Sequence, residues 1–462
     1  MHLPIPLLDF VFLWIDRPDT PANVGALLLF EPPGGQDATR AVRQVLKAYR
    51  RARPVAPFDR IPDLPALGLP HWRPAGPADP RRHVLHHQLP GPGTLGQLHE
   101  LVAKLHQTQL ERSRPLYEVH LIEGLSSGQF ALYIKSHHAT WDGRLALARI
   151  FGSASVAPGA ILPPFFAHDI PQAMPDPSAS PPLMASVRSL LLQGMALREL
   201  FTDLAARAAR VRERSQATAG NAPFAGPHTR FNQPVRAERS LATFSLPLER
   251  MRQVGRAFGG TVNDVVLAVV DAGVQRYLAA RDERPRDPLV AMCPISQREA
   301  GDLEATIKVT TLFVRLGAPR AGVERRMEAI VASTAAAKKE LRDFSREAAL
   351  DYAVLAFGLW FASHTLGLGA VTRPIVNLVV SNVGGVPGER YLGRSRLVGA
   401  YPVSMVADPT GLNITSLSSD GRMDFGILAD RAMVPDPDEI VRHCTAAFAQ
   451  LQRASRSRGV RS

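Results

Sequence analysis

Two adjacent histidines, followed four residues later by an aspartate, are the strongest candidates for chemistry in this sequence. They lie in the segment Ser136-His137-His138-Ala139-Thr140-Trp141-Asp142-Gly143, which has the pattern HHxxxDG. A histidine with an ordinary pKa of about 6.5 can act as a general base near neutral pH. Asp142 can hold the loop through a buried ion pair or cap the helix that follows. The pattern therefore predicts a general-base site at residues 137–143.

Two other interpretations of the histidine pair were weighed, a metal site and a purely structural role. Adjacent side chains at a strand end point in opposite directions, and no third histidine or carboxylate stands at a usable spacing. We therefore expect no metal. A structural pair that makes only hydrogen bonds remains the alternative.

Two further motifs resemble catalytic patterns but predict non-catalytic segments, a hairpin turn and a strand end. Gly124-Leu125-Ser126-Ser127-Gly128 matches the GxSxG nucleophile elbow, yet an elbow is followed by a helix and a strand is expected here. The doublet His86-His87 lacks the Asp-Gly pair and runs into a segment rich in proline and glycine, which predicts a solvated strand end. The sequence has no Walker loop, HExxH motif or Rossmann fingerprint, so ATP, zinc and NAD mechanisms lose support.

The elements that position the histidines are predicted from hydrophobic patterning. Apolar runs at 119–122 and 129–136 predict a hairpin whose second strand ends at the histidine pair, and residues 145–151 predict an apolar helix. A buried strand is expected within 20–32, followed by a proline-rich loop. A strand at 84–89 and a helix at 95–109 complete this part of the chain.

A proline-rich segment divides the chain. Eight prolines between about 156 and 182 exclude regular structure and predict a linker. Residues 184–214 predict a helix with one apolar side and six arginines against three acidic residues, which fits a surface helix or one that lies on an anionic membrane. We expect an N-terminal domain at 1–155, the linker and basic helix at 156–230, and a C-terminal domain at 231–462.

The C-terminal part predicts a second set of alternating strands and helices. Helices are expected at 248–258 and 261–276, the latter with Asn263 and Asp264 in its first turn. Strands are expected at 241–246, 289–292, 310–316, 375–380, 412–417 and 423–428. Two α/β halves joined by a linker are therefore predicted.

Composition and charge limit the classes of function. The 462 residues are 45% hydrophobic and 21% charged, which is typical of globular chains of two or three domains. The net charge of +12 suits an anionic partner such as a phosphorylated cofactor, an acidic lipid surface or nucleic acid. The basic residues are scattered, apart from an acid-free tail after Glu439 that we expect to be solvated. No nucleic-acid-binding signature is present, so no nucleic acid is expected as a partner.

Cysteine usage and apolar runs bear on location. Cys293 and Cys444 form no disulfide framework, which favours a reducing compartment, and no secretory signal is evident, so a cytoplasmic location is expected. Residues 352–372 contain no Asp, Glu, Lys or Arg. The glycine-rich second half of this segment favours a buried or membrane-dipping helix over a true span.

Several segments together resemble the bacterial wax ester synthase/acyl-CoA:diacylglycerol acyltransferase family. This family is related to chloramphenicol acetyltransferase-like acyltransferases and to peptide-synthetase condensation domains. Besides HHxxxDG, similar blocks are Arg112-Ser113-Arg114-Pro115-Leu116-Tyr117 with Gly124-Leu125, Thr261-Val262-Asn263-Asp264-Val265, Val380-Ser381-Asn382-Val383, and Asp420-Gly421-Arg422 through Ala429-Asp430-Arg431. The similarity extends from residue 8 to about residue 451.

The resemblance implies a fold and a set of site residues. The implied fold class is α/β (an α+β sandwich), with two chloramphenicol acetyltransferase-like domains and the active site in a channel between them. It implies His138 as the base, with His137, Asp142 and Gly143 shaping the loop. Substrate-binding or supporting residues would be Asn263, Asp264, Ser381 and Asn382. No metal and no resident cofactor are implied, since acyl-CoA is a co-substrate.

The chain departs from the family pattern at three places, two of which bear on selectivity. Tyr117 stands where tryptophan is usual, residues 383–388 form a longer block, and residues 304–308 lack the Gly-Asn expected after Pro294-Ile295-Ser296. The resemblance implies that the latter two segments line the acyl or alcohol channel. The acceptor and the acyl chain length therefore stay open, while the base is unaffected.

The implied reaction is direct acyl transfer from acyl-CoA to a long-chain alcohol or diacylglycerol, without an acyl-enzyme. Because both substrates partition into lipid, we expect peripheral attachment to an anionic membrane or lipid-droplet surface, at the inner membrane face or on lipid inclusions. One alternative is a condensation-type or polyketide-tailoring acyltransferase that takes its acyl group from a carrier protein. Another is a nonenzymatic lipid-binding protein at a membrane surface, which would not need an intact His138.

Overall fold

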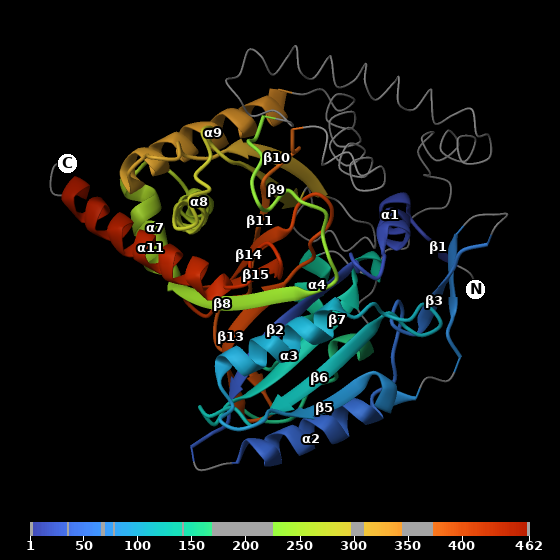
Figure 1. Ribbon diagram of the computed structural model, residues 1–462. Helices are drawn as coiled ribbons and strands as arrows, with labels where there is room; N and C mark the ends of the chain where they lie inside the picture. Colours follow the sequence, from blue (N-terminus) through green and yellow to red (C-terminus); the bar gives the residue numbers. More distant parts are fainter. Residues whose placement is uncertain are drawn as a thin grey trace.

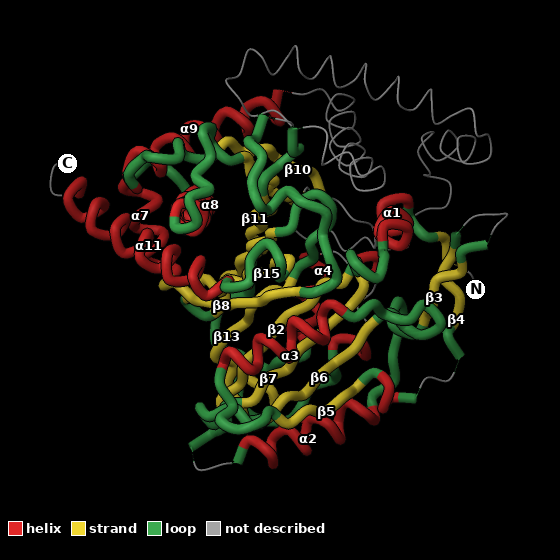
Figure 2. Tube along the Cα trace, viewed as in Figure 1, coloured by secondary structure: helices red, strands yellow, loops and turns green. Residues whose placement is uncertain are grey.

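Two six-stranded sheets organise the protein (Figure 1). The computed structural model describes residues 3–34, 37–65, 70–76, 79–140, 143–168, 225–296, 309–343 and 373–459. Figure 2 shows the strands of both sheets surrounded by helices. The two α/β halves predicted from the sequence are therefore present.

The first sheet carries the histidine motif on a central strand. Its order is β12-β13-β2-β7-β6-β5. The strands span Tyr391–Leu392, Ser395–Val403, Asn23–Glu31, Phe130–His137, Tyr117–Glu123 and Val84–Gln88 in that order. All eight residues of β7 are buried, as expected for a strand paired on both edges by β2 and β6. The predicted β6–β7 hairpin is confirmed.

Two strands of the first sheet come from the C-terminal part of the chain. β13 pairs antiparallel with β2 from Arg396 opposite Glu31 to Val403 opposite Gly25, and β12 pairs with β13. The predicted boundary, with residues 231–462 as a C-terminal domain, therefore does not separate the two sheets, because β12 and β13 belong to the first sheet. β13 covers an edge of β2 that would otherwise leave backbone groups unpaired, a long-range pairing that local patterning does not predict.

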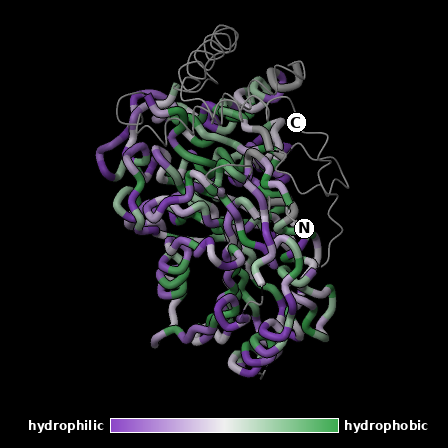
Figure 3. Tube along the Cα trace, turned by 90° about the vertical axis from the view of Figure 1, so that its right-hand side faces the viewer, coloured by the Kyte–Doolittle hydropathy of each residue, from purple (hydrophilic) through white to green (hydrophobic). Residues whose placement is uncertain are grey.

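The second sheet has the order β10-β9-β11-β14-β15-β8. Its strands span Val309–Arg315, Val290–Ser296, Leu378–Val383, Leu412–Ser419, Arg422–Asp430 and Arg239–Pro247 in that order. The helices α7 (Leu248–Ala257), α8 (Val262–Ala279), α9 (Val323–Asp343) and α11 (Pro437–Gly459) share a core with this sheet. Hydrophobic stretches run through the interior of this half, while its outer loops are largely hydrophilic (Figure 3).

The predicted solvated tail after Glu439 is wrong, because this segment forms α11. Its residues Cys444, Ala447, Phe448 and Leu451 are buried at the spacing of one helix face. Gly273 allows the close approach of α8, since a Cβ there would lie 2.3 Å from the Cys444 Sγ atom. The arginines of the tail occupy the outer side, with Arg442, Arg453 and Arg456 exposed.

Helix α3 (Leu95–Gln107) lies between the two sheets. Thr94 and Gln97 form a capping box that fixes its start. Its buried residues Leu98 and Val102 share one cluster with apolar side chains of both halves, namely Leu27, Tyr133, Leu241, Val403 and Leu428. This helix therefore joins the halves through a continuous apolar core.

The segment after β2 contains a helix that the prediction of a proline-rich loop missed. α2 (Ala38–Arg51) begins at Asp37, whose side chain accepts a hydrogen bond from the Thr39 backbone N–H. Val42, Val45 and Tyr49 form its buried face. The prolines lie outside this stretch, so the 3.6-residue spacing of these three residues was the available signal.

The remaining elements surround the first sheet. They are α1 (Leu7–Ile15), α4 (Gly143–Gly152), the 3₁₀ helices η1 (Pro80–Arg82), η2 (His138–Thr140) and η3 (Phe165–Ala167), and a small sheet of β1 (Leu3–Pro4), β4 (His71–Pro74) and β3 (Arg60–Asp63). α4 confirms the helix predicted after the motif.

The described residues bear on only part of the membrane-related predictions. The segments 184–214 and 352–372 lie outside the described residues. Within the described residues, no single helix has both the length and the apolar composition needed to cross a membrane. α7 and α8 pass that test only together, and they are bent by 95° relative to one another.

Candidate active site

The motif begins where β7 ends and is held by its own side chains. The Thr140 hydroxyl donates to the His137 carbonyl at 2.7 Å and lies 2.7 Å from the Ser136 hydroxyl. The His138 N–H donates to the Ala22 carbonyl at 2.8 Å. This 3₁₀ turn thus fixes the backbone of both histidines, while Gly143 begins α4 and Asp142 lies outside the described residues.

His137 is fully buried, and both of its ring nitrogens face protein groups. Nδ1 accepts a hydrogen bond from the Ala139 N–H at 3.1 Å. Nε2 lies 3.7 Å from the Asp16 Oδ2 atom, and neither side chain is exposed. A ring in this position is enclosed by protein and cannot meet a substrate.

Asp16 is the carboxylate beside His137, and sequence reasoning missed it. It accepts hydrogen bonds from the Ala22 N–H at 2.9 Å, the Gln109 side chain at 2.6 Å and the Arg112 guanidinium at 3.3 Å. Burial raises the pKa of Asp16, but the nearby His137 ring, with the hydrogen bonds from Ala22 and Gln109, outweighs burial and lowers the pKa below its ordinary value of 3.8. Asp16 is therefore a carboxylate held inside the fold.

His138 differs from its neighbour because its side chain is only partly buried. Its ring stacks on Phe12 of α1, with centroids 3.9 Å apart and planes 12° apart. The Nδ1 atom of His138 is buried, while the residue as a whole keeps part of its surface exposed. His138 thus has a ring that is fixed by stacking and is not fully enclosed.

The second half contacts the loop that holds the motif. Met405 and Ala407 form one apolar cluster with Ile15 and Ala22 of the first half. Arg239, which is buried, donates to the carbonyl of Asp19 at 2.7 Å. Residues of the second half therefore lie beside the turn that carries His138.

A buried histidine links the same regions. The Nε2 atom of His106 lies 2.7 Å from the Ser404 carbonyl, and its Nδ1 atom lies 2.6 Å from the Tyr133 hydroxyl. Burial lowers the pKa of His106 to about 3, so this ring is neutral and donates from Nε2 to Ser404. The Asn23 side chain donates to the carbonyls of His106 and Thr108 and so fixes the end of α3 beside β2.

The four predicted supporting residues of the second half occupy two places. Asp264 is buried and accepts hydrogen bonds from Thr261, in the first turn of α8, and from Thr334 of α9. Asn263 is half-buried beside it. Ser381 and Asn382 lie half-buried on β11, where the Ser416 hydroxyl bonds to both. The contacts of Asp264 make it a residue that joins α8 to α9.

The two motifs that were predicted to be non-catalytic lie at the edge of the first half. Ser126 lies in the exposed turn between β6 and β7, so a strand follows it as predicted. His86 and His87 lie near the end of β5, where His86 is exposed as predicted and both rings are bonded: His86 to Glu123 at 2.7 Å and His87 to His120 at 3.0 Å. Burial lowers the pKa of His87 to about 4.

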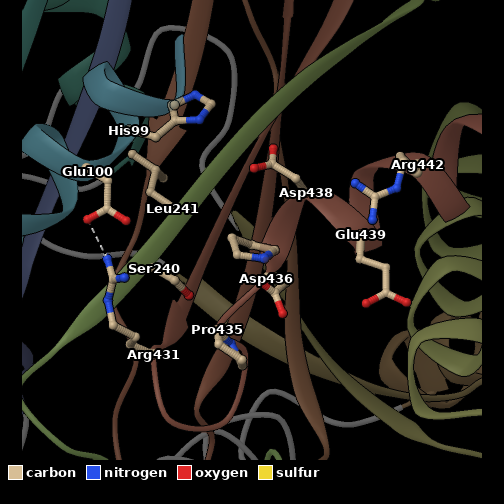
Figure 4. A pocket seen from close by; sticks show the side chains of 12 residues that line it. His99, Glu100, Ser240, Leu241, Arg431, Pro435, Asp436, Asp438, Glu439 and Arg442 are labelled. Atoms are coloured by element: carbon tan, nitrogen blue, oxygen red, sulfur yellow. Dashed lines mark hydrogen bonds and ion pairs between the residues drawn. The ribbon is translucent and has the colours of Figure 1, made fainter. Parts of the chain in front are cut away.

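A pocket of about 490 Å³ between the halves contains none of the predicted site residues (Figure 4). It is lined by residues of α3, β8 and the start of α11, and the ion pair of Glu100 with Arg431, at 2.7 Å, crosses it. Burial lowers the pKa of His99 in its wall to about 4, and the ring bonds to Thr243. These paired groups belong to the joint between the halves. Across the described ranges, no cluster of three or more His, Cys, Asp or Glu could hold a metal ion.

Comparison with known proteins decides the family. Residues 6–266 match the model of the wax ester synthase/diacylglycerol acyltransferase catalytic domain, and residues 308–452 match the model of the C-terminal domain of the same family. The chain belongs to the wax ester synthase/diacylglycerol acyltransferase family. It is an acyltransferase, as the resemblance of its motifs implied.

Relatives and solved structures agree over nearly the whole chain. The sequence is 33% identical over 458 residues to a putative diacylglycerol O-acyltransferase of Mycobacterium bovis, covering 96% of this chain and 98% of the relative. A wax ester synthase/diacylglycerol acyltransferase from Marinobacter aquaeolei VT8 is 28% identical with a TM-score of 0.78, covering 98% and 99% of the two chains. The first condensation domain of the calcium-dependent antibiotic synthetase has a TM-score of 0.57 at 15% identity, covers 98% and 96%, and shares the fold alone.

Proposed function

We propose that this acyltransferase uses His138 as a general base to transfer an acyl group from acyl-CoA to the hydroxyl of a long-chain alcohol or diacylglycerol. The observation that carries the proposal is the difference between the two histidines. His137 is fully buried and enclosed by Ala139 and Asp16, whereas His138 is fixed by Phe12 and Ala22 and keeps part of its surface exposed. The names of the mycobacterial and Marinobacter relatives support the acceptor classes.

In the proposed reaction, Nε2 of His138 removes the proton of the acceptor hydroxyl. The alkoxide oxygen attacks the thioester carbonyl and forms a C–O bond, and donors at the site stabilise the oxyanion. The C–S bond then breaks, and the protonated His138 returns its proton to the CoA thiolate. No bond forms between the acyl group and the protein, so acyl-CoA is a co-substrate and no resident cofactor is needed.

The supporting residues have indirect roles in this proposal. Asp16 and His137 hold the turn that presents His138, and the loop-shaping role of Asp142 and Gly143 is carried over from the family motif. Asn263 and Asp264 at the start of α8, with Ser381 and Asn382 on β11, support the second-half wall of the channel. The condensation-domain alternative has support from the fold alone.

Both acceptor classes are lipids, so we also propose that the enzyme acts at a lipid surface. It would attach peripherally to the cytoplasmic face of an anionic membrane or to lipid inclusions, where its acceptors are concentrated. The net charge of +12 favours such a surface.

The test is acyl transfer by the purified chain. Labelled palmitoyl-CoA is incubated with either hexadecanol or diacylglycerol, and ester formation is measured. His138→Ala should lower turnover by roughly 10²–10⁴-fold, the usual contribution of general acid–base catalysis. His137→Ala should lower it less, and the exposed His228→Ala serves as the matched control.

Two results would overturn the proposal. A folded His138→Ala variant that retained more than about a third of its turnover would remove His138 as the base. An acyl-protein adduct, found by mass spectrometry after a single turnover without acceptor, would replace direct transfer by a covalent mechanism.

A further inference from the structure

The outer side of α2 carries a concentrated group of cations. α2 lies at the far end of the first half from α7, α8, α9 and α11 (Figure 1). The neighbouring η1 contacts α2 and adds two arginines. We name this group the α2 surface, and its exposed members are Arg40, Arg43, Lys47, Arg51, Arg53, Arg81 and Arg82.

These seven cations have no acidic partner within the part of the chain that the structure describes. Among the described residues, no ion pair includes any of them. The two carboxylates beside them in sequence, Asp37 and Asp79, accept hydrogen bonds from the backbone N–H groups of Thr39 and Arg81. The α2 surface therefore presents unneutralised positive charge.

Another arginine-rich helix shows the usual arrangement. On α7, Arg252 and Arg256 both pair with Glu249, at 3.3 and 2.9 Å. In such pairs the opposite charges partly cancel, which weakens the electrostatic field outside the helix. α7 thus offers an internal comparison with the same residue type at similar exposure.

The apolar side of α2 packs into the hydrophobic core of the first half. Val42, Val45 and Tyr49 are no more than 2% exposed, and the Arg50 guanidinium bonds to the Val84 carbonyl. The helix cannot turn its apolar side outward without leaving the first sheet. Any partner of the α2 surface must therefore bind through charge, without insertion of this helix.

We propose that the α2 surface docks the protein on an anionic lipid surface by electrostatic attraction alone. This inference rests on the proposed function, because lipid acceptors place the enzyme at such a surface. The cations extend along a helix of 14 residues, or about 21 Å, which suits laterally mobile phosphate headgroups better than a single bound anion. A single-stranded nucleic acid would use exposed aromatic rings, and the one aromatic residue of α2, Tyr49, is buried.

The test measures vesicle binding of the full chain by sedimentation. Vesicles contain either phosphatidylcholine alone or phosphatidylcholine mixed with phosphatidylglycerol. The test variant is R40Q/R43Q/K47Q, and the matched control is R250Q/R252Q/R256Q on α7, which removes the same net charge. Each basic residue near an anionic membrane contributes about fivefold in affinity, so the test variant should bind anionic vesicles on the order of 100-fold more weakly.

The remaining expectations concern salt and activity. Wild type and control should bind anionic vesicles at low salt, leave them at about 1 M salt, where the screening length falls to about 3 Å, and ignore neutral vesicles. All three proteins should transfer a short acyl chain from CoA to a water-soluble alcohol equally well. If the wild-type protein lacked this activity with soluble substrates, the proposed function would be contradicted. The vesicle-binding result would still decide the docking proposal.

Three results would overturn the proposal. They are unchanged binding of the α2 variant to anionic vesicles, an equal loss in the α7 control, and binding by wild type that survives high salt. Tighter binding of a DNA oligonucleotide than of vesicles at physiological salt, with the same dependence on α2, would assign the surface to nucleic acid instead.

Discussion

Asp16→Asn tests whether a buried carboxylate positions the candidate base. The substitution keeps the shape of the side chain, removes its charge and replaces one acceptor oxygen by an NH₂ donor. Gln109 and Arg112 both donate to the Oδ2 atom of Asp16, at 2.6 and 3.3 Å, and His137 lies 3.7 Å from the same atom. The Ala22 N–H donates to the other oxygen, Oδ1, at 2.9 Å. Because an amide keeps only one acceptor oxygen, either this N–H or the neighbours of Oδ2 must face an NH₂ group and lose their acceptor.

The magnitude follows from the burial of this pair. Neither the Asp16 nor the His137 side chain is exposed, and removing one partner of a buried pair costs about 3–5 kcal/mol of unfolding free energy. The same loop carries Ala22, whose carbonyl fixes the His138 N–H at 2.8 Å. A shift of about 1 Å at a reacting group can lower the rate about 100-fold, so turnover should fall together with stability.

The pH dependence of this effect has a definite sign. The pKa of Asp16 in the folded protein is below 3.8, because His137 and the other donors outweigh the opposing effect of burial. The stabilisation is therefore complete above the unfolded pKa and is lost as the pH falls through the lower folded pKa. The difference in stability between wild type and Asp16→Asn should be constant near neutral pH and should shrink only below about pH 4.

Thermal unfolding and steady-state turnover with palmitoyl-CoA measure both effects. Asp19→Asn is the matched control, since Asp19 lies in the same loop with an exposed side chain and its substitution makes the same change of charge. The control should keep the melting temperature and the turnover of wild type. If Asp16→Asn also kept both, the buried pair would have no part in positioning the histidines.

Two further substitutions address contacts of the same turn. Phe12→Leu removes the ring that stacks on His138, so the imidazole loses one fixed face and turnover should fall about 2–10-fold. Unchanged turnover would argue against a positioning role for this stack. Arg239→Lys keeps the charge, but a single ammonium cannot reproduce the separate bonds to Arg236 and Asp19. Turnover should fall, and full turnover would show that this bridge is dispensable.

The strand, turn and helix around the histidine motif could be predicted from sequence, because the residues that determine them are neighbours in the chain. The apolar run before His137 predicted β7, the glycine-rich turn before it predicted the hairpin, and the apolar residues after Gly143 predicted α4. Each depends on neighbours within about ten residues, where hydrophobic period and turn chemistry act directly. The family blocks added the identity of the reaction class.

The missed features depend on partners distant in sequence. In the sequence, Asp16 is only the polar residue at the end of an apolar run. Its contact with His137 joins positions 121 residues apart, which local patterning does not predict. β13 pairs with a strand more than 360 residues away, and nothing in its own pattern names that partner. The segment of α11 was predicted to be a solvated tail because of its arginines, although the spacing of Cys444, Phe448 and Leu451 indicates the buried side of a helix.

The candidate base thus takes its residue type from a local motif and its geometry from remote segments. β7 and η2 supply the ring of His138, but α1 supplies the stacking face and the loop at Ala22 supplies the backbone acceptor. That loop is bound in turn by the second half, through Arg239 at Asp19 and through the apolar contact of Met405. Because these contacts come from both halves, the position of His138 depends on the second half as well as on the strand that carries the motif.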